Sequence, residues 1–345
     1  MKKIISIIGA RPQFIKHAPM QLVLQKYFNA VTIHTGQHYD KNMSNVFFEE
    51  LGINEPEYML NIKASSQGEQ TGRMMMEIEK VCLNLKPDYV LVYGDTNSTL
   101  AAALVAAKLQ IPIIHIESGL RSFNREMPEE INRIVTDQFS DLLFCPNNEA
   151  VLNLKKEGID HDRIFICGDV MCDTLRLIKD SVRRLNANPY YFATIHRPYN
   201  TDDEQRLIYV LEMLNKLDNI VIFPIHPRTI ARLKSFNFAI DKLTNIQFIE
   251  PVGYTDSISY QKFANCVITD SGGVQKEAYM LKKKCITIRK ETEWTDTLKG
   301  DWNILVFDDL ERLPLLVNRP TGEYVEGLFG DGYSAEQIID IIRNN

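Results

Sequence analysis

The stretch YVLVYGDTNSTLAAALVAAKLQIPIIHI (89–116) places two short apolar runs on either side of a longer, alanine-rich segment. The flanking runs, YVLVY and IPIIHI, are rich in β-branched and aromatic residues and have the length of buried strands. The segment between them opens near Thr96 and has the length of a helix. The stretch therefore predicts a strand, a helix and a second strand, which is the unit from which parallel sheets are built.

The same alternation continues along the chain in both directions. Amphipathic segments with helical spacing, such as Thr71 to Leu85, separate the apolar runs. We therefore predict the α/β class, with two doubly wound parallel sheets of similar size. Ligands of such sheets bind outside the carboxyl ends of the strands, so the cleft between the halves is the expected site. The other strand candidates are residues 4–8, 30–35 and 141–145 in the first half and 191–195, 219–225, 246–250, 266–270 and 285–289 in the second.

The join between the halves and the last residues each suggest a helix. The first covers Val170 to Leu185 and is followed by NANP (186–189), which disfavours a helix and suits a hinge. The second lies in DGYSAEQIIDIIRNN (331–345), with Ser334 as its N-cap.

Length and composition limit the classes of function. A chain of 345 residues suggests two domains. Its net charge of -6 argues against a nucleic-acid partner, so an anionic ligand must be held by local donors. Its six cysteines form no C-x-x-C pair, which favours buried free thiols and a cytoplasmic protein. Arg11 interrupts the N-terminal apolar run, no run is long enough for a bilayer, and no cluster has metal-ligand spacing.

Polar residues follow the predicted strands of the first half. Gly9 permits a tight turn from which Arg11 projects, although this is also how an ordinary strand-to-helix turn looks. Asp95 follows YVLVY directly, where it is either functional or an N-cap. Glu117 ends IPIIHI, where a carboxylate must be paired, hydrated or catalytic. Glu129 and Glu130 open a predicted helix after Pro128, where acids commonly serve the helix dipole alone.

The second half repeats the arrangement with histidines. His196 and Arg197 follow its first strand, and His226 and Arg228 follow its second, although a lone histidine is more often structural.

A further turn, TDSGGVQKEA (269–278), leads from a strand straight into a helix. Amides at Ser271, Gly272 and Gly273 can hold a diphosphate, and Glu277 can accept hydrogen bonds from ribose hydroxyls. A Gly-Gly turn on its own is weak support for such a site.

Eight motifs follow one another along nearly the whole chain, and their order and spacing resemble the non-hydrolysing UDP-N-acetylglucosamine 2-epimerases. They are GARPQFIK (9–16), TGQHYD (35–40), YGDTNSTLAAA (93–103), HIESGLRS (115–122), MPEEINR (127–133), GDVMCDTL (168–175), HRP (196–198) and DSGGVQKEA (270–278). The resemblance implies two Rossmann-like domains of the GT-B type with the active site between them. Residues 1–170, joined by the C-terminal helix 333–345, form one domain, and residues 171–332 form the UDP-binding domain.

The resemblance also implies a reaction. UDP leaves carbon 1 of a UDP-N-acetylamino sugar while a base removes the proton on carbon 2, and re-addition with protonation from the opposite face gives the epimer. No cofactor or metal is implied, and the enzyme is expected to be a cytoplasmic homodimer that supplies precursors of surface polysaccharides. The implied catalytic residues are Asp95, Glu117, Glu129 and His196, and the implied substrate-binding residues are Arg11, Lys16, His226, Ser271, Gly272, Gly273 and Glu277.

Three departures bear on the substrate. Lys276 stands where the best-known branch has an acid, Trp294 where it has an arginine, and Asp40 where it has an amide that contributes to a second, activating substrate site in some members. RSFNREMPEE and KETEW resemble instead the branch acting on UDP-2,3-diacetamido-2,3-dideoxy-glucuronic acid, whose carboxylate could pair with Arg125, Arg228 or Lys276.

Three other functions remain open. A GT-B glycosyltransferase shares the fold and a UDP-sugar donor, a hydrolysing epimerase releases free sugar, and a UDP-sugar sensor only binds.

Overall fold

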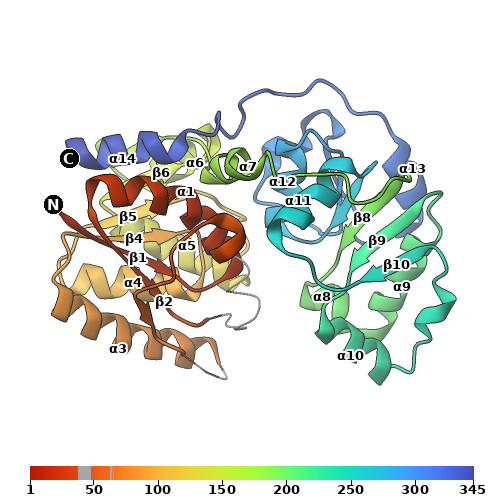
Figure 1. Ribbon diagram of the computed structural model, residues 1–345, viewed down its shortest axis with the longest axis horizontal. Helices are drawn as coiled ribbons and strands as arrows, with labels where there is room; N and C mark the ends of the chain where they lie inside the picture. Colours follow the sequence, from red (N-terminus) through yellow and green to blue (C-terminus); the bar gives the residue numbers. More distant parts are fainter. Residues whose placement is uncertain (38–47, 63, 65) are drawn as a thin grey trace. The chain divides into compact units, whose positions relative to one another are not determined.

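The chain forms two compact units, Met1–Lys179 with Gly327–Asn345 as unit 1 and Asp180–Glu326 as unit 2 (Figure 1). The structure is a computed structural model that describes residues 1–37, 48–62, 64 and 66–345, without the side chains of residues 227 and 228. Both units combine a parallel sheet with helices, as the alternation of strands and helices predicts.

Unit 1 is built on a seven-stranded parallel sheet in the order β3-β2-β1-β4-β5-β6-β7. One group of helices, α1, α7 and α14, packs together, and α3, α4 and α5 form a second group. Figure 1 shows α14 and α3 on opposite faces of the sheet. The strands are β1 Lys3–Ile8, β2 Asn29–His34, β3 Tyr58–Met59, β4 Tyr89–Tyr93, β5 Ile113–Ile116, β6 Leu142–Cys145 and β7 Ile164–Ile166, and the helices are α1 Arg11–Tyr27, α3 Gln67–Leu85, α4 Asn97–Lys108, α5 Pro128–Phe139, α6 Asn148–Lys156, η1 His161–Arg163, α7 Val170–Ile178 and α14 Ser334–Asn344.

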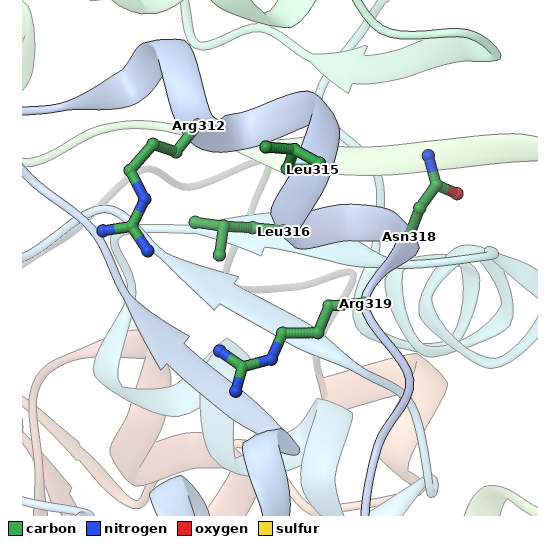
Figure 2. Close-up of a pocket in the computed structure, with 5 residues that line it drawn as sticks. All are labelled: Arg312, Leu315, Leu316, Asn318 and Arg319. Carbon is green, nitrogen blue, oxygen red and sulfur yellow. The ribbon is translucent and has the colours of Figure 1, made fainter.

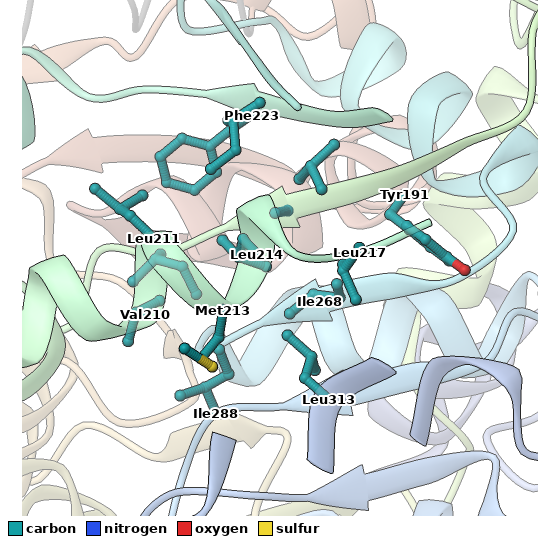
Figure 3. Packing of buried hydrophobic residues seen from close by; sticks show 14 of the residues in the cluster. Tyr191, Val210, Leu211, Met213, Leu214, Leu217, Phe223, Ile268, Ile288 and Leu313 are labelled. Carbon is teal, nitrogen blue, oxygen red and sulfur yellow. The ribbon is translucent and has the colours of Figure 1, made fainter. Parts of the chain in front are cut away.

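Unit 2 is built on a six-stranded parallel sheet in the order β10-β9-β8-β11-β12-β13. Its largest hydrophobic cluster joins residues of α9 and α13 to apolar side chains of the strands (Figure 3). The strands are β8 Tyr190–Thr194, β9 Ile220–Pro224, β10 Ile246–Ile249, β11 Val267–Thr269, β12 Cys285–Thr287 and β13 Asn303–Leu305, and the helices are α8 Pro198–Thr201, α9 Glu204–Asn215, α10 Pro227–Ser235, η2 Ile240–Lys242, α11 Tyr254–Phe263, α12 Gly272–Met280, η3 Thr295–Asp301, η4 Leu310–Arg312 and α13 Leu313–Asn318.

The two helices predicted near the ends of unit 1 differ in detail from the structure. The predicted helix Val170 to Leu185 ends at Ile178, and the chain passes into unit 2 after Lys179. Ser334 is the first residue of α14 and makes no side-chain cap, so the predicted N-cap is wrong. The amides of Ser334 and Ala335 donate instead to Asp173 on α7, at 3.2 and 2.8 Å. Since α7 and α14 pack on α1, the units divide at 179 and 327, not at 170 and 333.

A buried histidine on α1 ties the stability of unit 1 to pH. His17 Nδ1 lies 2.8 Å from Tyr93 Oη and Nε2 lies 3.1 Å from Thr32 Oγ1. Burial lowers the pKa of His17 from 6.5 to about 3, so between these pH values the unfolded chain binds a proton that the folded chain does not bind. The contribution of the neutral His17 to the free energy of unfolding is therefore complete above pH 6.5 and is lost as the pH falls toward 3.

We therefore expect the free energy of unfolding of a His17→Gln variant to depend less on pH than that of the wild type. Between pH 6 and pH 4 the difference in slope should be about 1.4 kcal/mol per pH unit, the value for one proton. Burial lowers the pKa of His34 to about 4, so a second proton contributes equally to both proteins. Urea unfolding at several pH values measures the slopes, and equal slopes would contradict the assignment to His17.

Candidate functional site

In unit 1 the candidate residues follow three adjacent strands. Arg11 comes after β1, Asp95 after β4 and Glu117 after β5, and β1, β4 and β5 are neighbours in the sheet. Because the strands are parallel, their carboxyl ends share one edge. The chain order reverses between β1 and β4, which is where doubly wound sheets bind ligands.

The turn after β1 is held by Gln13. Its Oε1 accepts hydrogen bonds from the amides of Gly9 and Ala10, at 2.8 and 3.1 Å, and its Nε2 donates to the Tyr93 carbonyl at 3.1 Å. A Cβ on Gly9 would lie 2.2 Å from Thr35 Oγ1, so only glycine fits. Arg11 is the first residue of α1 and Pro12 is the second.

Glu117 forms a buried ion pair with Lys16 of α1. The Lys16 and Glu117 side chains are 7% and 9% exposed. Glu117 has φ = 66°, a left-handed conformation that costs about 1–3 kcal/mol in a residue with a side chain and is typical of active sites. Gly94 lies beside the pair, and a Cβ on it would be 3.3 Å from both Glu117 Oε1 and Lys16 Nζ.

Asp95 does not cap the following helix. Thr96 takes that role, since its side chain accepts from the Thr99 amide at 3.3 Å. The Asp95 carboxylate instead forms an ion pair with Arg133 of α5, while Asn132 Nδ2 donates to the Asp95 carbonyl at 2.9 Å. The Asp95 side chain is 33% exposed and is therefore fixed but accessible.

The two acids that open α5 differ. Glu130 is buried and accepts hydrogen bonds from the Ser122 and Phe123 amides, each at 2.9 Å, which fixes the preceding loop. Arg133 also contacts it, at 3.2 Å. Glu130 is thus a structural residue, whereas Glu129 is partly exposed in the first turn of α5 and remains a candidate for proton transfer.

In unit 2 the histidines also follow adjacent strands. His196 comes after β8 and His226 after β9, and Asp270 follows β11 on the other side of β8. The buried Asp270 carboxylate accepts from the amides of His196 and Arg197, at 3.1 and 2.9 Å, and from Asn200 Nδ2 at 3.0 Å. His196 Nδ1 lies 3.4 Å from Asp270, and its ring is 51% exposed. Asp270 therefore orients an accessible imidazole.

The Ser271-Gly272-Gly273 turn opens α12, as predicted. Ser271 Oγ caps the helix by accepting from the Val274 amide at 3.4 Å. A Cβ on Gly272 would lie 2.5 Å from Glu293 Oε1 and 3.6 Å from Arg289 Nη1. Arg289 pairs with Glu293 at 3.0 Å, so a buried guanidinium stands at this helix N-terminus, where anions are stabilised.

Glu277 lies one turn into α12 and is 4% exposed. Gln261 Nε2 of α11 donates to Glu277 Oε2 at 2.8 Å and fixes the carboxylate.

Lys276, one of the three cations suggested as partners for a substrate carboxylate, is buried and contacts another side chain of the protein. It is 1% exposed, and its ammonium lies 4.1 Å from the centre of the Trp294 ring. Lys276 and Trp294, which both differ from the best-known branch, therefore contact each other in one cation–π interaction. Arg125 is exposed, whereas the side chain of Arg228 and all of Asp40 lie outside the described residues.

A pocket of about 380 Å³ lies elsewhere on unit 2, at α13 (Figure 2). Its lining contains no acid and no histidine, and no candidate residue contributes to it. The lining residues are Arg312, Leu315, Leu316, Asn318 and Arg319.

Sequence reasoning missed the residues that hold the candidates in place. Arg133 belongs to the motif MPEEINR (127–133). It lies three residues after Glu130, and this helical spacing is the one local signal that Arg133 forms ion pairs. Asn132 gave no such signal, because its partner Asp95 is distant in the sequence. Gln13 has local partners in the Gly9 and Ala10 amides, but its contact with the Tyr93 carbonyl is distant. The described part of the chain contains no cluster of three potential metal ligands and no helix that could span a membrane.

Comparison with known proteins gives one consistent result. The family described as UDP-N-acetylglucosamine 2-epimerase matches residues 21–343. The UDP-2,3-diacetamido-2,3-dideoxy-D-glucuronate 2-epimerase of Pseudomonas aeruginosa is 44% identical over 354 residues, 99% of each chain. The UDP-N-acetylglucosamine 2-epimerase of Methanocaldococcus jannaschii is 44% identical over 363 residues, 99% of this chain and 98% of the relative. Its crystal structure with UDP-GlcNAc and UDP has a TM-score of 0.88 and 43% identity, covering 99% of this chain and 100% of that one.

Proposed function

The chain belongs to the UDP-N-acetylglucosamine 2-epimerase family, and on that basis we propose that it inverts carbon 2 of a UDP-linked N-acetylamino sugar by elimination and re-addition of UDP. The reaction needs no cofactor, because the base and the acid are side chains. The observation that carries the proposal is the set of carboxylates at one edge of the unit 1 sheet, where Lys16 pairs with Glu117 and Arg133 pairs with Asp95.

The residue types suit the two proton transfers that the reaction needs. One group must remove the proton on carbon 2 and another must deliver a proton to the opposite face, and Asp95, Glu117 and Glu129 are the candidates in unit 1. Carboxylates also stabilise the positive charge that develops near carbon 1 as UDP leaves.

Unit 2 supplies the groups that hold UDP. The diphosphate is held by the amides at Gly272 and Gly273, which begin α12, with Arg289 beside them. Glu277 receives the ribose hydroxyls, and His196 and His226 supply further donors. Arg11 and Lys16 of unit 1 complete the set of substrate-binding residues.

Two substrates are proposed, UDP-N-acetylglucosamine, whose sugar carries no charge, and its 3-acetamido uronate analogue. The M. jannaschii and P. aeruginosa relatives are equally identical to this chain and carry the two different names. Of the cations suggested for the uronate carboxylate, Arg125 is exposed and therefore free to reach a ligand, unlike the buried Lys276.

The test is incubation of the protein with each UDP-sugar in deuterated water, followed by proton NMR. We expect the epimer to form without any acceptor and to carry deuterium at carbon 2, because the removed proton exchanges before re-addition. Retention of hydrogen at carbon 2 would exclude the two-face mechanism. Sugar transfer that requires an acceptor would indicate a glycosyltransferase. Release of free sugar together with UDP would indicate a hydrolysing epimerase, and binding without turnover would indicate a sensor.

We also propose a cytoplasmic homodimer that supplies precursors of surface polysaccharides. All six cysteines are free thiols, which suits a reducing compartment. Exposed apolar side chains on α3 and α5, namely Met76, Leu83, Ile131 and Phe139, offer a surface for a second copy. Light scattering on the purified protein tests the dimer.

A further inference from the structure

A fully buried histidine lies behind the carboxylates of unit 1. His115 is on β5, two residues before Glu117, and its side chain is 0% exposed. Its Nδ1 lies 2.7 Å from Asp137 Oδ1 of α5, and its Nε2 lies 2.8 Å from the Gly94 carbonyl oxygen. Both ring nitrogens therefore face hydrogen-bond acceptors.

These contacts determine where the ring carries a hydrogen. The Gly94 carbonyl oxygen can only accept, so the Nε2 that faces it must carry a hydrogen to make its bond. Nδ1 lies against the Asp137 carboxyl group, which holds the ring in this orientation.

The groups around the ring hold Asp137 in place. Arg121 Nη1 contacts Asp137 Oδ2 at 2.7 Å, and its Nε and Nη2 donate to the exposed Glu157 at 2.7 and 2.6 Å. Burial opposes ionisation of Asp137, but His115 and Arg121 hold its pKa below the usual range. The buried Asp137 is therefore fixed from both sides, by Arg121 and by His115.

The Gly94 carbonyl connects this network to the proposed catalytic residues. It belongs to the peptide group that joins Gly94 to Asp95, in a turn where Gly94 has φ = 59°. A Cβ on Gly94 would touch both Glu117 and Lys16. By holding this carbonyl, His115 fixes the turn that carries Asp95 and packs against the Lys16–Glu117 pair.

We propose that His115 is a positioning residue, held by Asp137 and donating its Nε2 hydrogen to the Gly94 carbonyl, which fixes the turn that carries Asp95. This role rests on the proposed function. The charged groups that face it are Asp137 and, through Asp137, Arg121 and Glu157, while Glu117 and Lys16 lie beyond the Gly94 turn. Of the other titratable groups nearby, the Cys145 thiol on β6 has its pKa raised by burial to about 12 and stays neutral.

The hydrogen on Nε2 is tested by NMR on the full-length protein labelled with ¹⁵N at its seven histidines. A His115→Gln variant identifies the His115 signals by their loss, and His161→Gln, at an exposed position on η1, is the matched control. We expect the Nε2 of His115 to carry a hydrogen, because it faces the Gly94 carbonyl oxygen. An Nε2 without a hydrogen overturns the proposal, and this result does not depend on whether the protein turns over a UDP-sugar.

The positioning role is tested by kinetics of the same two variants. His115→Gln should lower kcat by about 10–100-fold, as for other residues that orient a reacting group, with KM changed less than twofold. His161→Gln should match the wild type. A folded His115→Gln protein with wild-type kcat overturns the role, and absence of epimerase activity in the wild type overturns the proposed function instead.

Discussion

Replacing Glu117 by glutamine is expected to lower turnover by about 10²–10⁴-fold, the range for loss of a group that transfers a proton. Glutamine keeps the size of the side chain but has no charge and no basicity. The left-handed backbone at Glu117 and its buried contact with Lys16 show that the site keeps a strained, costly arrangement, which is typical of a residue retained for function. Steady-state kinetics on either proposed UDP-sugar measures the loss.

The same loss is expected for Asp95→Asn and Glu129→Gln, and the exposed Glu126→Gln, three residues from Glu129, is the matched control. Circular dichroism should show an intact fold in each variant. Lys16 loses a buried partner in Glu117→Gln, so some loss of stability is expected in addition. Wild-type turnover in all three variants would remove the carboxylates from the mechanism.

Replacing Glu277 by alanine is expected to weaken UDP binding by about 1–3 kcal/mol, which is roughly 5–150-fold in Kd. Glu277 is held rigidly by Gln261, so its hydrogen bonds to the ribose are formed without a cost of ordering. Isothermal titration calorimetry with UDP measures the change without turnover.

Two further variants separate a role in binding from a role in folding. Glu277→Gln keeps an acceptor for Gln261 but removes the charge, and it should bind UDP with intermediate affinity. Glu311→Ala, at an exposed position on η4, should bind as the wild type does. Unchanged UDP affinity in Glu277→Ala would place the ribose elsewhere.

The fold was largely predictable because strands buried in a parallel sheet have a strong local pattern. The predicted strands 4–8 and 89–93 correspond to β1 and β4, and their ends differ by no more than one residue. The helix predicted for Val170 to Leu185 was too long because residues 179–185 are held by a tertiary contact, in which the Arg183 amide donates to Ser259 Oγ. No local pattern reports such a contact.

The site was predictable only in part, for the same reason. Asp95 and Glu117 could be proposed as site residues because they follow predicted strands, and strand ends are where doubly wound sheets bind ligands. Whether Asp95 caps the following helix could not be decided from sequence, since its carboxylate pairs with Arg133, 38 residues away. Lys276 was considered for the substrate because a lysine is normally exposed, and only packing against Trp294 reveals its burial.

The division of unit 1 into two chain segments has a consequence for how the protein is made. During synthesis, all of Asp180–Glu326 leaves the ribosome before Gly327–Asn345, which unit 1 needs for α14. The hydrogen bonds from the Ser334 and Ala335 amides to Asp173 on α7 can therefore form only after α14 has been synthesised. Until then the Asp173 carboxylate and the faces of α1 and α7 that pack on α14 are uncovered. Unit 2 can fold as a continuous segment while the nascent unit 1 is still incomplete. A nascent chain arrested before residue 327 should accordingly protect unit 2 from protease and leave α1 and α7 sensitive.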